Sequence, residues 1–130
     1  MINQTTATAS EAETELQARN SATIAAQNDL FRSSLGGTPQ LTGTVVTTMG
    51  VITRGEIFHL KAMEAVRSFS RFDEDNDPHG EHDFGSIEID GQTIFWKFDL
   101  YAPDMKHGSS HPSDPEHTHR VLTVMLASEY

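Results

Sequence analysis

The stretch that decides the fold is GSIEIDGQTIFWKFDLY, residues 85–101. Asp90-Gly91 separates two runs of alternating apolar and polar residues, and Asp-Gly is a strong signal for a two-residue hairpin turn. Side chains of successive strand residues point to opposite faces, so the second run has one wholly apolar face and one mixed face. The apolar face is expected in the core: Ile94, Trp96, Phe98 and Leu100. The mixed face is expected to be half exposed: Phe95, Lys97, Asp99 and Tyr101.

Two helices and one strand are predicted before this hairpin. Apolar residues recur at helical spacing from about Leu16 until Gly36-Gly37, where glycine ends the pattern. A second apolar stripe runs through residues 54–70, and Thr53 is positioned to cap it. Between them, the Thr- and Val-rich stretch Thr44–Met49 is typical of a strand.

The last segment, RVLTVMLASEY at residues 120–130, is predicted to be a strand because its apolar residues alternate, although a helix face remains an alternative. The element order α-β-α-β-β-β indicates an α+β domain, with two helices packed on one face of a mainly antiparallel sheet of about four strands. Residues 1–15 contain few large apolar side chains and are expected to form a flexible tail. Residues 16–130 then form a single domain.

Composition limits the class of protein. The chain has no cysteine, which excludes disulfides and thiolate metal sites and fits a reducing compartment. It has no apolar run of about 18 residues, as a membrane helix needs, and no secretory signal pattern, so we expect a cytoplasmic location without membrane contact. The net charge of −10 argues against direct nucleic-acid binding and favours a protein partner with a basic surface.

The candidate site is FDEDNDPHGEHDFG, residues 72–85, in which six of fourteen residues are acidic and two are His. Asp73, Asp75 and Asp77 have the spacing of the first ligands of an EF-hand. Pro78 stands where that calcium loop needs Gly, and Phe84 where it needs a bidentate Glu. The spacing therefore does not indicate an EF-hand.

A transition-metal site is a second alternative. Imidazole and carboxylate groups together suit a divalent ion such as zinc, manganese or iron. Glu81 would be the base of a metal-assisted hydrolase or nuclease in this reading, with Asp104 as a possible further ligand. No cysteine or G-x-S-x-G sequence supplies a nucleophile, so we assign no catalytic residue. The metal ligands of this alternative would be His79, His82, Asp83 and His107.

A structural reading accounts for part of the same stretch without a ligand or cofactor. Asp and Asn side chains bond to nearby backbone N–H groups, and Asn-Asp-Pro strongly favours a turn. His82 can bridge two segments, while Phe72 and Phe84 anchor the two ends in the core. The residues expected to shape the loop are Asn76, Pro78, Gly80, His82 and Phe84.

The carboxylates of the stretch are then free to bind a basic protein surface, which is the interpretation that we prefer. Charge complementarity of this kind speeds encounter and sets specificity. The predicted partner-binding residues are Asp73, Glu74, Asp75, Asp77, Glu81 and Asp83. The oligomeric state is not predicted.

Three motifs carry a family resemblance: D-N-D-P-x-G-E-H-D-F-G, F-W-K-x-D and R-V-L-T-x-M-L-A-x-E-Y. With these motifs, the chain from about Leu16 to Tyr130 resembles a family of small bacterial proteins of unknown function that are common on plasmids and other mobile elements. The resemblance implies an accessory role for a mobile element. Together with the acidity, it suggests an inhibitor of a host defence complex, either a CRISPR effector or a restriction system.

Overall fold

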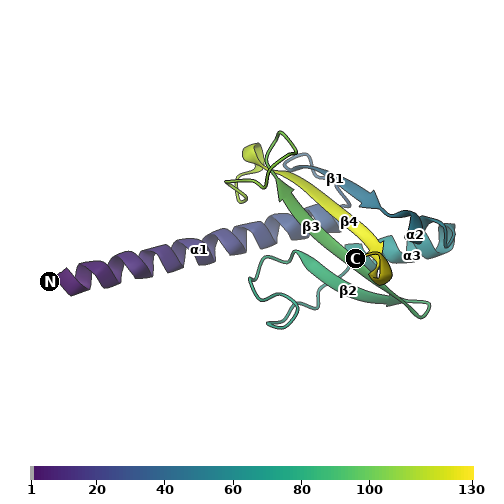
Figure 1. Cartoon of the computed structure of the whole chain (residues 1–130), viewed down its shortest axis with the longest axis horizontal. Helices are drawn as coiled ribbons and strands as arrows, with labels where there is room; N and C mark the ends of the chain where they lie inside the picture. The colour runs from purple at the N-terminus through teal and green to yellow at the C-terminus, as the bar shows by residue number, and fades with distance from the viewer. Residues whose placement is uncertain (1) are drawn as a thin grey trace.

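The computed structural model describes the backbone of residues 2–130 and the side chains from residue 10 onward. A four-stranded sheet in the order β1-β4-β3-β2 forms its centre, and the helices lie behind it in the view of Figure 1. The elements are α1 (Ile2–Ser33), β1 (Thr42–Thr47), α2 (Met49–Ile52), α3 (Glu56–Arg67), β2 (Phe84–Ile89), β3 (Gln92–Tyr101), the 3-10 turn η1 (Pro115–His117), β4 (His119–Leu126) and the 3-10 turn η2 (Ala127–Glu129).

The predicted hairpin is confirmed as β2 and β3, which pair antiparallel. Its turn has Asp90 at φ 49° and Gly91 at φ 79°, both in the left-handed region that a type I′ turn requires. β3 also pairs antiparallel with β4, so the last segment is a strand as far as Leu126, as predicted, and then ends in the turn η2. β1 pairs parallel with β4, which makes the sheet mixed. The α+β fold class is confirmed.

The core lies between one face of the sheet and helices α1 and α3. The predicted apolar face of β3 is confirmed as core, because Ile94 and Trp96 are fully buried and Phe98 is nearly so. Phe31 of α1 packs edge-on against Phe98, with ring centroids 5.8 Å apart. Ala62 of α3 is fully buried in the same cluster. Both long helices therefore cover one face, and no α-helix of the described residues covers the opposite face of the sheet.

The start of α3 and the end of β1 differ from the prediction. Helix α3 begins after Gly55 rather than at Thr53, because residues 49–52 form the extra short helix α2. Thr53 instead ends α2, where its N–H donates to the carbonyl of Met49 at 2.8 Å. Strand β1 accordingly ends at Thr47, two residues before the predicted end.

Helix α1 begins at Ile2 in the structure, whereas the apolar pattern predicted a start at about Leu16. Figure 1 shows this N-terminal part of α1 projecting beyond the sheet. The side chains from Ser10 to Asn20 are exposed, so burial does not stabilise this segment. The flexibility of residues 1–15 stays a prediction. Met1, which this prediction includes, lies outside the described residues.

The acidic loop as a candidate functional site

Residues 68–83 connect α3 to β2, and we call the part from residue 72 to residue 83 the acidic loop. Its outer turn is built by side chains that cap backbone groups. One carboxylate oxygen of Asp73 accepts the N–H groups of Asp75 and Asn76, both at 2.9 Å. The Asn76 side chain accepts the N–H of Asp73 at 3.0 Å and donates to the carbonyl of Arg71 at 2.8 Å. Side chains of the turn therefore accept three of its own backbone N–H groups.

Asp77 points inward and holds the second turn of the acidic loop. Its side chain is only 5% exposed, and one carboxylate oxygen accepts the N–H groups of Glu81 and His82, both at 3.1 Å. Gly80 and His82 have φ of 67° and 54°, and for a non-glycine residue such as His82 this left-handed conformation is strained. We predicted that Asp77 would contact a partner, but the structure gives its carboxylate a structural position.

His82 fastens the acidic loop to α1. Its Nδ1 lies 2.9 Å from the carboxylate of Asp29, and its Nε2 lies 3.6 Å from that of Asp77. The imidazole ring stacks on Phe72 with a centroid distance of 3.8 Å and an interplanar angle of 2°. Asn28 of α1 adds a bond from its side-chain N–H to the carbonyl of Glu81 at 3.0 Å. The bridging role predicted for His82 is consistent with these contacts.

The same part of α1 also holds a buried arginine. Arg120, at the start of β4, is fully buried and donates to the side-chain oxygens of Asn28 at 3.0 Å and Gln27 at 2.5 Å. Burial lowers the pKa of Arg120 to about 10. Sequence analysis missed this cluster, although the polar run Gln27-Asn28-Asp29 within an apolar helix segment is a signal that could have indicated it.

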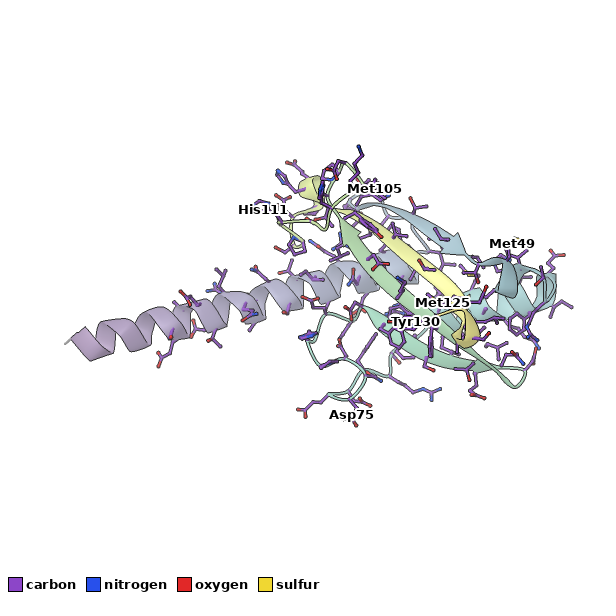
Figure 2. All side chains as sticks on the ribbon, in the orientation of Figure 1. Met49, Asp75, Met105, His111, Met125 and Tyr130 are labelled. Atoms are coloured by element: carbon purple, nitrogen blue, oxygen red, sulfur yellow. The ribbon has the colours of Figure 1, made fainter. Side chains whose placement is uncertain are left out.

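The outer carboxylates have a different environment from Asp77. Asp73, Glu74 and Asp75 are exposed, and Figure 2 shows Asp75 at the outer end of the acidic loop. Glu81 and Asp83 are partly buried. No Lys or Arg of the described chain forms an ion pair with any of these five residues.

Glu81 and Asp83 carry an electrostatic cost. Burial raises the pKa of Glu81, and the negative charge of Asp83 raises it further. Burial likewise raises the pKa of Asp83, and the charge of Asp77 adds to the effect. Both shifts mean that the local environment disfavours the ionised carboxylates. A cation placed beside them would reverse that effect.

The residues of the alternative metal site do not form a ligand cluster. His107 lies in the connection after β3, where its Nδ1 is 3.0 Å from the carboxylate of Asp104, and His79 is exposed on the acidic loop. Within residues 10–130, whose side chains the structure describes, no group of three or more His, Asp or Glu side chains is arranged to hold a metal ion.

Phe84 does not anchor the acidic loop in the core, because it begins β2 on the helix-free face. There its ring lies 5.0 Å from that of Phe95 and 6.1 Å from that of Tyr130. Figure 2 labels Tyr130 on this side of the sheet, where the residue is 77% exposed. Of the two predicted anchors, only Phe72 packs against the core, next to Trp96.

A family model described as "Protein of unknown function (DUF3768)" matches residues 46–129. The matched range includes the acidic loop and strands β2, β3 and β4. No curated protein matches the chain, and no solved structure does. None of the described helices has the length and hydropathy needed to cross a membrane.

Proposed function

The chain belongs to the DUF3768 family of proteins of unknown function, and from that premise we propose that it acts by binding a protein partner with a basic surface. The acidic loop is the contact surface in this proposal. The observation that carries it is a cluster of exposed carboxylates, Asp73, Glu74 and Asp75, on a loop that is fastened to the domain.

Pre-organisation supports this role. A flexible acidic segment loses conformational freedom when it binds, which lowers its affinity. Here the turn is capped by Asp73 and Asn76, and the base of the loop is held by Asp77 and His82. The outer carboxylates are therefore presented with much of the ordering already complete.

The raised pKa values of Glu81 and Asp83 give a second reason. A Lys or Arg side chain from a partner would stabilise the ionised form of both carboxylates, so part of the electrostatic cost in the free protein would be relieved on binding. This differential effect favours a basic partner over a neutral one.

In its specific form, the proposal is that the partner is a nucleic-acid-binding host defence complex, either a CRISPR effector or a restriction system, and that the protein is an accessory of a mobile element. Such complexes present basic grooves, which fixed carboxylates can occupy in competition with phosphates. The net charge of −10 supports this choice. So does burial of Arg32 and Arg120, which removes two of the nine Lys and Arg residues from the surface.

The test is affinity capture from host cells with intact defence systems, using a charge-reversed loop. Glu74→Lys/Asp75→Lys is the informative variant, because neither side chain makes a hydrogen bond in the structure and the capping bonds are kept. Glu11→Lys/Glu13→Lys on the exposed part of α1 is the matched control, with the same change in charge.

We expect wild type and the control to retain a defence nuclease or one of its subunits, and the loop variant to lose it. The retained complex should also dissociate as salt concentration rises, because exposed charge pairs are screened. Equal recovery by the loop variant, or recovery of no such complex by any form, would refute the proposal.

A further inference from the structure

The outer edge of β2 presents unpaired backbone groups. Among the described strands β2 pairs only with β3, and it forms one edge of the sheet. The N–H of Phe98 donates to the carbonyl of Asp83 at 2.8 Å, and in an antiparallel ladder the bonded residues alternate. Gly85 and Ile87 therefore also direct their N–H and C=O groups toward β3. Three residues direct theirs outward: Phe84, Ser86 and Glu88.

A groove runs beside this edge. Two adjoining hollows lie along the β2 edge. The hollow of about 570 Å³ lies between β2 and α3, and the hollow of about 460 Å³ lies between β2 and residues 65–71 at and after the end of α3. Both hollows are lined by Ala65 and Glu88, so together they form one groove. It extends from Arg71, near the start of β2, to Leu60, near the end of β2. A groove along an unpaired strand has the shape that an extended peptide occupies.

The floor of the groove is apolar on the side that faces α3. Ile87 and Ile89 line it from β2, and Ala65 and Phe69 line it from the α3 side. Directly opposite residues of two antiparallel strands project to the same face of the sheet. Residues of an added strand that lie opposite Ile87 and Ile89 would therefore place their side chains in the groove.

The two ends of the groove differ in charge. At one end Lys61 is paired with Asp90 at 3.1 Å. At the other end Arg71 is exposed, and no described carboxylate forms an ion pair with it. Ser68, Ser70 and Ser86 line the same hollow as Arg71 and add hydroxyl groups. Glu88 lines this hollow as well, but it forms no ion pair with Arg71, so the guanidinium and the hydroxyl groups are available to a carboxylate of the ligand.

We propose that the outer edge of β2 binds an extended segment of a partner protein, which adds as a fifth, antiparallel strand. The segment places two apolar side chains at alternate positions in the groove and then a carboxylate at Arg71. The antiparallel direction follows because β2 runs from the Arg71 end to the Lys61 end. A segment whose carboxylate follows its apolar residues and reaches Arg71 must therefore run antiparallel to β2. This surface is separate from the outer carboxylates of the acidic loop.

The first test uses fluorescein-labelled synthetic peptides and fluorescence polarisation. Thr-Val-Thr-Val-Thr with a free C-terminal carboxylate is compared with its C-terminal amide, with the amide of Thr-Val-Thr-Val-Thr-Asp, and with Thr-Ser-Thr-Ser-Thr as a free acid. We expect the two valine peptides that carry a carboxylate to bind more tightly than the other two. Preference for the free acid identifies a C-terminus as the ligand, and preference for the Asp peptide identifies a side chain. Binding of both valine carboxylates no tighter than the Thr-Ser peptide overturns the proposal.

Variants locate the binding. Ser86→Pro removes an outward N–H at a sheet edge, where proline is tolerated, and should abolish peptide binding, whereas Ser86→Thr should not. Arg71→Glu should weaken binding by about tenfold or more, since it replaces a charge-assisted bond with repulsion. Unchanged affinity in Ser86→Pro and Arg71→Glu would overturn the proposal.

Amide hydrogen exchange of the wild type gives a readout that does not depend on folding of a variant. The valine peptides should slow exchange at Phe84, Ser86 and Glu88, the residues whose N–H groups face outward. Protection confined to the helix-free face, for example at Tyr130, would contradict strand addition. Glu74→Lys/Asp75→Lys should bind the peptides no more weakly than wild type does, whereas it should lose the partner of the acidic loop, which separates the two proposals.

Discussion

Replacing Asp77 with alanine tests whether the acidic loop is a fixed structure or a loose acidic segment. The substitution removes the acceptor of two backbone N–H groups, those of Glu81 and His82, and the second carboxylate near the His82 ring. Because the site is buried, these donors lose their partner without free access to water. A buried donor left unsatisfied costs about 1–3 kcal/mol, and partial rehydration of the loop reduces the sum, so we expect a loss of about 2–4 kcal/mol in the free energy of unfolding.

Urea and thermal denaturation, followed by circular dichroism, measure this loss. For a domain of this size it corresponds to a fall in Tm of about 10 °C. Asp75→Ala is the matched control, because its carboxylate is exposed and makes no hydrogen bond, and it should change stability by less than about 0.5 kcal/mol. Asp77→Asn keeps an oxygen acceptor and should lie between the two. If Asp77→Ala and Asp75→Ala have equal stability, Asp77 does not hold the loop.

Three other predictions follow from the same structure. The pKa of Glu81 in the folded state lies above its ordinary value of 4.5, so the native state binds more protons than the unfolded state between the two pKa values, and stability falls as pH rises through this range. Urea denaturation midpoints should therefore show Glu81→Gln to be more stable than wild type at neutral pH but not below pH 4.5. An equal effect at both pH values would contradict the raised pKa of Glu81. Gly85→Ala places a Cβ against the Trp96 indole and should cost about 1–3 kcal/mol in a denaturation experiment, whereas an unchanged midpoint would show that the ring can shift freely. Deleting residues 2–15 removes side chains that are exposed from Ser10 onward, so Tm should change by no more than about 2 °C, and a larger fall would reveal a stabilising contact of this segment.

Local patterns in the sequence predicted the central elements. Alternation and the Asp90-Gly91 turn act between near neighbours, which is why β2, β3 and the buried face around Trp96 could be identified. The parallel pairing of β1 with β4 joins Thr42 to His119, and no local pattern encodes a partner so far along the chain. The short helix α2 was also missed, because four residues are too few for a periodic pattern.

In the acidic loop too, contacts between near neighbours differ in predictability from contacts between distant residues. The caps made by Asp73 and Asn76 follow from the general tendency of Asp and Asn to bond backbone groups in turns, but Asp73 was expected to contact a partner and not to cap the turn. The anchoring of His82 by Asp29 joins residues 53 positions apart, and it depends on how α1 crosses the domain. Asp77 is buried and Asp75 is exposed, and composition alone cannot show that difference.

The contacts between the acidic loop and α1 bear on where the independently folding part of the chain begins. The matched family range starts at residue 46, but three residues of α1 that lie before it make these contacts. Asn28 and Asp29 bind the acidic loop, and Gln27 accepts a hydrogen bond from Arg120. A fragment cut at the family boundary would expose the Arg120 cation and release one side of the loop. The cooperative unit therefore includes the second half of α1, and relatives of this chain need an equivalent helix if they keep the same loop.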